Sequence, residues 1–189
     1  MKTTNIMIVG VGGQGTLLAS RILGNAVIRQ GHDVKVSEVH GMSQRGGSVV
    51  TYVKYGEEVQ SPIIDKGEAD IILAFELLEA YRALPWLKKG GKMIVNTQMI
   101  NPMPVITGAA AYPENILEKL GASVDVTSLD ALSLALQAGT AKAANVVLIG
   151  VMAKSTSIPY EEWVETVRAS VPPKFVDVNL KAFELGYNL

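Results

Sequence analysis

The chain has 189 residues, and its 17 basic and 18 acidic side chains leave a formal net charge of −1. Neither sign forms a long run, so we expect neither nucleic acid nor a membrane surface as a partner. The sequence has no cysteine, which excludes disulfides, thiolate zinc sites and cysteine-ligated iron–sulfur clusters within this chain.

The composition is apolar, with 48% hydrophobic and 19% charged residues. We expect residues 1–189 to form a single domain, in which the apolar excess lies either in a subunit interface or in a well-filled core with alanine-rich helices. The longest apolar run, 144–153 with Asn145 inside it, is too short to cross a bilayer. The N-terminus runs into a glycine-rich turn without a small-residue cleavage site, so we expect a cytoplasmic protein.

The first motif is a glycine-rich turn between an apolar run, 6–9, and a helical pattern that extends to about residue 29. Its members are Gly10, Val11, Gly12, Gly13, Gln14 and Gly15. A strand, a tight turn and a helix N-terminus create an anion-binding geometry, because unpaired N–H groups point outward and residues without a Cβ allow close approach. The glycine spacing also fits the dinucleotide-binding fingerprint, although the same glycines serve any tight turn between a strand and a helix.

The next two strands argue against a dinucleotide-binding unit. Residues 33–39 alternate with period two, and Glu38 takes the place of the acid that holds a ribose in such units. A second strand, 48–55, follows after a short glycine-bounded loop. A parallel crossover needs a dozen or more residues, so we expect these strands to be antiparallel or in different layers.

The rest of the chain alternates predicted strands and helices. We expect an edge segment over 59–64, a buried parallel strand over 69–75, a helix over 76–84, a closing turn at 88–91, a strand over 92–96, a loop with an extended piece at 101–106, a helix over 113–121, a strand over 123–126, and helices over 131–138, 144–153, 159–168 and 176–185. Ser128 or Asp130 is the expected cap of the helix at 131, and Ser157 of the helix at 159. The pattern predicts an α/β fold: a three-layer, Rossmann-like sheet, mostly parallel with an antiparallel strand, and helices on both faces.

Few side chains indicate catalysis. Glu38 and His40 share a strand face and fit either an acid–base or metal pair or, with fewer assumptions, an ion pair at the strand end. We therefore predict no metal site and no catalytic residue in this chain, and we expect His32 to lie exposed in a loop. The methionines of the predicted loops form either an adaptable contact surface or scattered core filling; they are Met42, Met99 and Met103.

The glycine-bounded loop at 41–47 is the second motif. Its candidate site residues are Ser43, Gln44, Arg45, Gly46 and Gly47. Arg45 is the only cation of the loop, and its planar guanidinium between glycines suits a carboxylate, a phosphate or a partner main chain. A hairpin-like turn with a solvated arginine is the simpler alternative.

Together, the glycine turn at 10–15 and the stretch Ser-Glu-Val-His-Gly-Met-Ser-Gln-Arg-Gly-Gly at 37–47 resemble the gamma-type subunit or domain of 2-oxoacid:ferredoxin oxidoreductases. Within this family the chain is most similar to the beta subunits of indolepyruvate ferredoxin oxidoreductases. The resemblance covers the whole chain. The two motifs in this order are more specific than the glycine fingerprint alone.

The resemblance implies an accessory subunit of an enzyme that oxidatively decarboxylates aryl 2-oxoacids to acyl-CoA, with CoA as co-substrate, and passes electrons to ferredoxin. It implies that thiamine diphosphate, Mg²⁺ and the iron–sulfur clusters belong to a larger (alpha) subunit, and that this chain binds none of them alone. The matching residues, 12–15 and 43–47, inherit an interface or site-rim role. A free-standing NAD(P)-binding oxidoreductase that uses Gly10, Gly12, Gly15 and Glu38 is the alternative.

Overall fold

The computed structural model describes residues 3–39 and 46–189, in which six strands form one sheet in the order β2-β3-β1-β4-β5-β6. Their bounds are β1 (Thr4–Val11), β2 (Asp33–Val39), β3 (Ser48–Gly56), β4 (Ala69–Ala74), β5 (Leu87–Asn96) and β6 (Asp125–Leu129). β3 runs antiparallel to both of its neighbours, β1 and β2, whereas β1, β4, β5 and β6 pair in parallel. The predicted sheet, mostly parallel with an antiparallel strand, is therefore confirmed.

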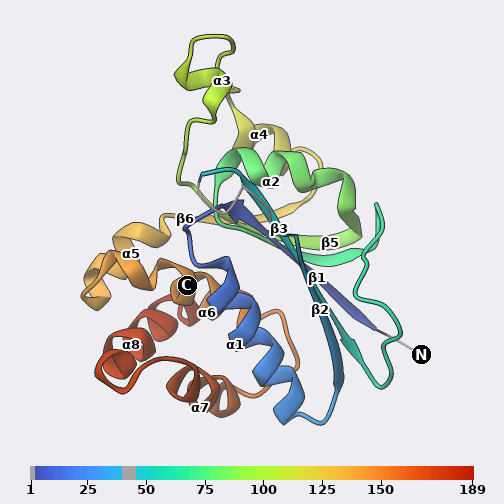
Figure 1. Cartoon of the computed structure of the whole chain (residues 1–189), viewed down its shortest axis with the longest axis vertical. Helices are drawn as coiled ribbons and strands as arrows, with labels where there is room; N and C mark the ends of the chain where they lie inside the picture. The colour runs from blue at the N-terminus through green and yellow to red at the C-terminus, as the bar shows by residue number, and fades with distance from the viewer. Residues whose placement is uncertain (1–2, 40–45) are drawn as a thin grey trace.

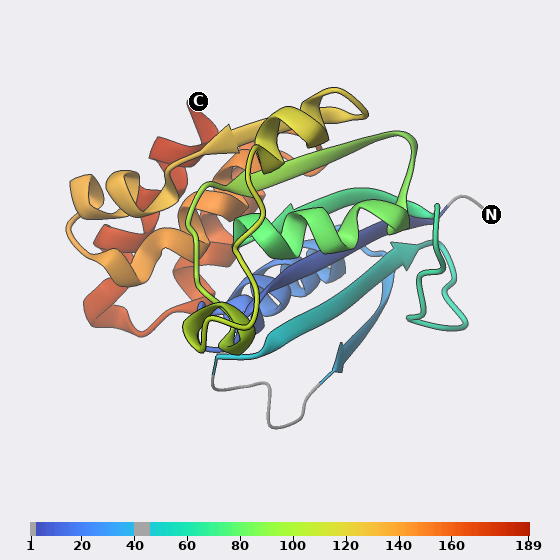
Figure 2. The same ribbon diagram turned by 90° about the horizontal axis from the view of Figure 1, so that it is seen from above.

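Helices cover both faces of this sheet (Figures 1 and 2). The long-helix face carries α1 (Thr16–Arg29), α5 (Ala131–Ala138), α6 (Ala144–Ala153), α7 (Tyr160–Ser170) and α8 (Val176–Tyr187). The short-helix face carries α2 (Leu77–Ala83) and α4 (Ile116–Gly121). Alternation along β1 sends Ile6 and Ile8 into the first core and Met7 and Val9 into the second, as the two-residue period of a strand requires. The three-layer prediction is confirmed.

Two glycines set how closely α6 and α8 approach each other. A Cβ on Gly150 would lie 2.2 Å from the carbonyl oxygen of Phe183, and one on Gly186 would lie 2.0 Å from that of Val147. Neither position can hold a side chain unless the helices move apart. The glycines therefore allow the two backbones to touch, and Phe183 and Trp163 fill the surrounding core without any exposed surface.

Several predicted boundaries are wrong. The predicted closing turn at 88–91 belongs to β5, where Gly90 has φ +78° and the register to β4 shifts between Ala69 and Ile71. This irregularity lets the strand continue through a sequence that is typical of a turn. The segment 59–64 forms no strand; its Val59 and Ile64 are buried, and the Val59 amide donates to the Asp33 carboxylate over 2.9 Å.

The chain between β5 and β6 also differs from expectation. Where an extended piece was predicted within 101–106, the chain forms a short helix, α3 (Met103–Ile106). None of the residues of α3 is buried. α4 begins at Ile116 rather than near 113, because Asn115 before it has a left-handed backbone with φ 55°. β6 begins at Asp125 and extends to Leu129, later than the predicted 123–126.

The other local predictions have mixed outcomes. Asp130 caps α5 by accepting a hydrogen bond from the Ser133 amide over 3.0 Å, as expected. Ser157 does not cap α7, whose N-cap position is Pro159. His32 is half-buried rather than exposed, because its ring packs on Tyr55 with the centroids 5.8 Å apart. Three short 3-10 helices complete the described chain: η2 (Leu84–Trp86), η3 (Ala141–Ala143) and η4 (Pro173–Phe175).

Candidate functional site

The glycine turn at 10–15 joins the end of β1 to the start of α1, as predicted. The Gly12 amide donates to the carbonyl oxygen of Gly47 over 2.9 Å, so the end of the second sequence motif lies beside the middle of the first. Ser43, Gln44 and Arg45, together with His40 and Met42, lie outside the described residues. Of the second motif, the structure therefore describes Gly46, which is exposed with φ +89°, and Gly47.

The glycines of the turn have distinct steric roles. A Cβ on Gly10 would lie 2.9 Å from both Gln14 Oε1 and Phe75 Cβ. Gly15 has φ +84°, and its Cβ would lie 2.6 Å from the amide nitrogen of Asn145. Gly13 has φ +101° but faces open space. Gly10 and Gly15 are thus needed for packing, whereas Gly13 is needed for backbone conformation and leaves room beside it.

Gln14 fastens the turn to the neighbouring strands. Its Oε1 accepts from the Val11 amide over 2.7 Å, and its Nε2 donates to the Phe75 carbonyl over 2.9 Å and to Gln98 Oε1 over 3.0 Å. These contacts connect the carboxyl ends of β1, β4 and β5. Gln14 is therefore a positioning residue within this chain.

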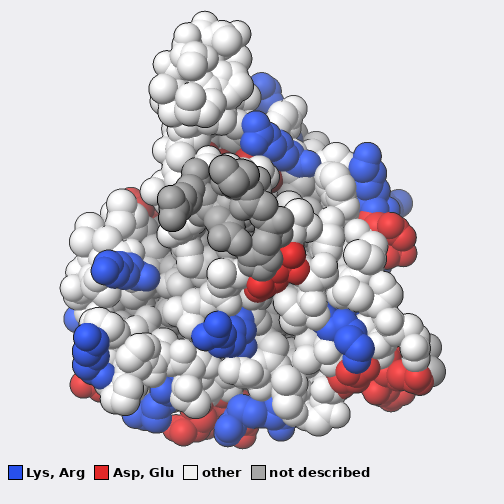
Figure 3. All heavy atoms as spheres, viewed as in Figure 1, with Lys and Arg blue, Asp and Glu red and all other residues white. Residues whose placement is uncertain are grey.

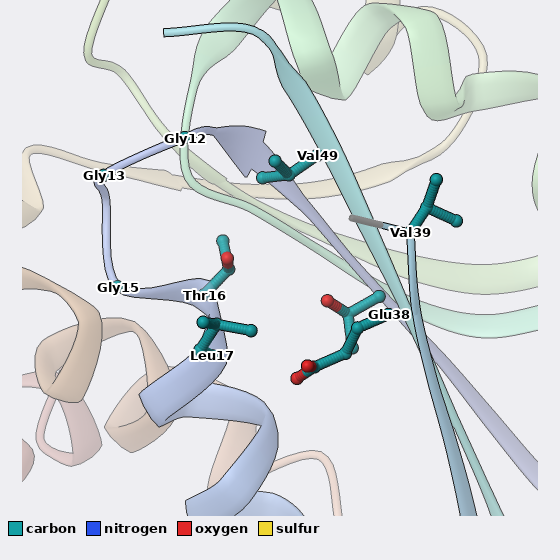
Figure 4. Close-up of a pocket in the computed structure, with 9 residues that line it drawn as sticks. Gly12, Gly13, Gly15, Thr16, Leu17, Glu38, Val39 and Val49 are labelled. Atoms are coloured by element: carbon teal, nitrogen blue, oxygen red, sulfur yellow. The ribbon is translucent and has the colours of Figure 1, made fainter. Parts of the chain in front are cut away.

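A hollow of about 300 Å³ lies between the turn, the first residues of α1 and the ends of β2 and β3 (Figure 4). It is lined by Gly12, Gly13, Gly15, Thr16, Leu17, Glu38, Val39, Val49 and Thr51. No side chain caps the N-terminus of α1, and its first turn has no acidic residue, so the positive end of the helix dipole is left for another group. Glu38 extends toward α1 and accepts a hydrogen bond from the Ser20 hydroxyl over 2.8 Å.

A second hollow, of about 450 Å³, lies on the other side of the glycine turn. The chain leaves β1 toward the long-helix face and leaves β4 toward the short-helix face, so this is the crevice in which open α/β sheets bind ligands. Its polar side chains are those of Gln14, Asn96, Gln98, Lys142 and Asn145. Asn96 donates to the Phe75 carbonyl over 3.0 Å and accepts from the Ala131 amide over 3.1 Å, so it orders the rim.

Sequence reasoning missed this second hollow. Its polar side chains come from three separate parts of the chain, and none belongs to a motif apart from Gln14. The available signal was Asn96, a carboxamide directly at the end of a buried strand. A ligand in this crevice would meet carboxamides and the ammonium of Lys142, which suits a polar or anionic group.

The sheet order bears on the dinucleotide alternative. In a dinucleotide-binding unit the strand that carries the ribose-binding acid lies next to β1. Here β3 lies between β1 and β2, so Glu38 stands two strand spacings away, about 10 Å. The geometry of the two strands thus departs from that of a dinucleotide site, as the short connection at 40–47 predicts.

Side chains that could ligate a metal do not cluster in the described part of the chain. Within residues 3–39 and 46–189, His, Asp and Glu side chains form no group of three that could hold a metal ion, and the predicted pairing of Glu38 with His40 extends beyond that part of the chain. None of the helices in the same range combines the length and apolar character needed to span a bilayer.

Comparisons with known proteins agree with this architecture. The family model of pyruvate ferredoxin/flavodoxin oxidoreductase matches residues 5–189. The chain is 46% identical to the indolepyruvate oxidoreductase subunit IorB of Thermococcus kodakarensis, over 98% of this chain and 95% of that one. It is 30% identical to the ketoisovalerate oxidoreductase subunit VorA of Methanothermobacter marburgensis, over 98% of this chain but 36% of that one.

Among solved structures, the keto/oxoacid ferredoxin oxidoreductase gamma subunit of Geobacter sulfurreducens superimposes with a TM-score of 0.73. The two chains are 26% identical, and the match covers 98% of this chain and 96% of that one. The sheet with one reversed strand, the glycine turn and the full-length sequence match all point the same way. The chain belongs to the pyruvate ferredoxin/flavodoxin oxidoreductase family.

Proposed function

We propose that this chain is the accessory subunit of a 2-oxoacid:ferredoxin oxidoreductase that acts on arylpyruvates such as indolepyruvate. The observation that carries the proposal is the 46% identity to the IorB subunit, which extends over nearly the full length of both chains. The complex decarboxylates the 2-oxoacid oxidatively, forms the acyl-CoA and passes the electrons to ferredoxin. It works in the cytoplasm.

In this proposal the larger subunit carries thiamine diphosphate, Mg²⁺ and the iron–sulfur clusters. Enzymes of this kind use thiamine diphosphate and iron–sulfur clusters, and this sequence has no cysteine with which to ligate a cluster. The residues of this chain therefore do not fit such a cluster. This chain contributes a surface that helps to enclose the reaction.

We assign the glycine turn and the 43–47 stretch to the rim of the shared site. The open N-terminus of α1 and the room beside Gly13 support this role, because both admit an anionic group or a partner backbone. Arg45 then faces the larger subunit near the 2-oxoacid or CoA. Its fork of N–H donors suits a carboxylate or a phosphate.

Arg45→Lys tests the role of the rim. The change keeps the charge and loses the bidentate fork, so we expect a loss of about 1–3 kcal/mol in assembly or turnover. Arg21→Lys, at an exposed position of α1, is the matched control and should change either quantity by less than about 0.5 kcal/mol. Equal values for both variants would remove Arg45 from the site.

The function is tested by expressing this chain with and without the larger subunit. The complex should reduce ferredoxin when indolepyruvate and CoA are supplied, and pyruvate should be a poorer substrate. The chain alone should be inactive. Turnover by the chain alone, or binding of NADH to it with micromolar affinity, about 8 kcal/mol, would support the NAD(P)-binding alternative instead.

A further inference from the structure

An uncharged arm projects from the short-helix face. The arm comprises residues 100–112, contains α3, and stands away from the sheet at the top of Figure 1. Residues 93–113 contain no Asp, Glu, Lys or Arg, and in the space-filling view the projecting end is white (Figure 3). Met103 is 65% exposed and Ile106 63% exposed, and Met99 just before the arm is 57% exposed. The arm therefore presents apolar side chains to the surroundings rather than to the core.

The end of the arm has a defined shape. The Thr107 amide and hydroxyl both bond to the Met103 carbonyl, over 2.9 and 3.0 Å, and the Ala110 amide donates to the Pro104 carbonyl over 3.0 Å. Pro102 and Pro104 restrict the backbone further, because each ring fixes φ. The arm thus presents its apolar residues in a fixed arrangement.

One buried carboxylate binds both ends of the arm, Ile100 and Tyr112. Glu76 is 1% exposed, and its Oε1 accepts from the Ile100 amide over 3.0 Å and from the Tyr112 hydroxyl over 2.6 Å. Its Oε2 accepts from the Glu79 amide over 2.9 Å and so caps α2. Ile100 and Tyr112 are the two ends of the arm, so a single side chain fixes where the arm leaves the body and in which direction.

The hydroxyl of Tyr112 stays a donor to this carboxylate. Burial, followed by the neighbouring Glu76 carboxylate, raises the pKa of Tyr112 above its ordinary value of 10.0. The same hydroxyl oxygen accepts from the Leu78 amide over 3.0 Å. Tyr112 therefore keeps its hydroxyl proton at neutral pH. We call the hydrogen bonds from Ile100 and Tyr112 to Glu76 the clamp of the arm.

These observations conflict if the chain acts alone. A buried polar group costs free energy unless it is hydrogen-bonded. The hydrogen bonds of Glu76 fix an arm whose helix α3 has no buried residue. Apolar side chains that are held in place but left exposed are typical of a surface that another protein covers. The arm is narrow, so it suits insertion into a groove rather than contact with a flat face.

We propose that the arm inserts into an apolar groove of the larger subunit, and this inference rests on the proposed function. The length of a relative supports this choice of occupant. VorA of Methanothermobacter marburgensis contains the equivalent of 98% of this chain within about a third of its own length, so there the unit is continuous with a larger polypeptide. Because the arm carries no charge, the groove must be apolar as well. Charged side chains in the groove would lose their hydration without gaining a partner on the arm.

The test measures the affinity of this chain for the separately expressed thiamine-diphosphate subunit. The double variant Met103→Gln/Ile106→Gln should bind at least about 30-fold more weakly, the loss expected for the centre of an interface. Ile28→Gln is the matched control, since Ile28 is 57% exposed in the last turn of α1 on the long-helix face, and its affinity should stay within about threefold. A second variant replaces residues 101–111 by a short Gly-Ser linker and should abolish binding.

Each other outcome has a defined meaning. If the unmodified chain does not bind the thiamine-diphosphate subunit, the proposed function fails. If it binds and the arm variants bind equally well, the proposed function stands and the arm inference is overturned. Sedimentation of the free chain tests whether a second copy of this chain covers the arm instead. If the unmodified chain is a dimer and the double variant is a monomer, the arm belongs to that dimer and the proposal is overturned.

Discussion

The two faces of the sheet are stabilised in different ways. On the long-helix face, α6 buries nine of its ten residues, and Trp163 and Phe183 are fully buried. On the short-helix face the layer consists of two helices of seven and six residues and continues into the uncharged arm. Of the carboxylates in the described chain, the buried ones are Glu76 and Glu79, and both belong to α2 or its cap.

This difference separates the layer whose large apolar cluster stabilises the fold from the layer that presents apolar side chains on the arm. A large apolar cluster fills the long-helix face, and its helices also share an ion pair between Arg29 and Glu162. Charge-assisted hydrogen bonds hold the short-helix layer: the Glu79 carboxylate accepts from the Ser48 hydroxyl and pairs with Arg82, while Glu76 holds the arm. Both faces carry single exposed apolar side chains, but on the short-helix face Met103 and Ile106 gather on the arm.

Gly186→Ala gives the largest expected effect. The new methyl would lie 2.0 Å from the Val147 carbonyl oxygen, so α6 and α8 must separate, and we expect a loss of about 3 kcal/mol or more in the free energy of unfolding. Gly121→Ala in α4 is the control on the short-helix face, since its methyl would meet open space and should be neutral or stabilising by up to about 1 kcal/mol. Urea unfolding measures both. Similar losses at the two positions would show that the faces do not differ.

Gln14→Ala tests the contacts that connect the carboxyl ends of β1, β4 and β5, between the two helix layers. The change leaves the Val11 amide without its acceptor and removes a donor from the Phe75 carbonyl, so we expect a loss of about 1–2 kcal/mol in unfolding free energy. Gln98→Ala removes one of the same partners from an exposed position and should cost about 0.5 kcal/mol. An equal loss for both variants would argue against a special role of Gln14.

Tyr112→Phe should cost about 1 kcal/mol at neutral pH, because it removes the hydroxyl that donates to Glu76. The pKa of Tyr112 is raised, so the folded chain favours the protonated phenol, and its stabilising effect is complete below the ordinary pKa of 10.0. The effect declines as the pH rises above that value. The difference in unfolding free energy between the unmodified chain and the variant should therefore shrink at alkaline pH, and a constant difference would contradict the clamp.

Met103→Gln and Ile106→Gln give the smallest effects on the free chain. Both side chains are largely exposed, so each change should alter the unfolding free energy by less than about 0.5 kcal/mol. Thermal unfolding of the free chain measures this. A loss above about 1 kcal/mol would show that the arm packs on its own body.

Local chemistry explains which elements were predictable. α6 occupies 144–153 as expected, because this run after a glycine stop is apolar apart from Asn145 and is long enough for a buried helix. The reversed strand β3 follows from a connection too short for a crossover. The continuation of β5 through 88–91 was not predictable, because it depends on pairing with β4 and on the left-handed Gly90.

The candidate site was predictable only in part. The glycine turn follows from its motif, whereas its contact with Gly47 and the crevice around Asn96 and Lys142 depend on which strands become neighbours. The hydrogen bonds from Ile100 and Tyr112 to Glu76 could not be predicted from the sequence either. Nothing near Glu76 in the sequence indicates that residues 24 and 36 positions later return to one of its oxygens.

The central place of β1 has a consequence for synthesis of the chain. β1 is made first and buries seven consecutive residues, but its partners β3 and β4 end at Gly56 and Ala74. At the usual translation rates, synthesis of the stretch between Val11 and Ala74 takes roughly 3 to 13 s. Pairing with β3 becomes possible once Gly56 has been made, but the edge that pairs with β4 stays open until Ala74, so the nascent chain carries an apolar strand with at least one unpaired edge throughout.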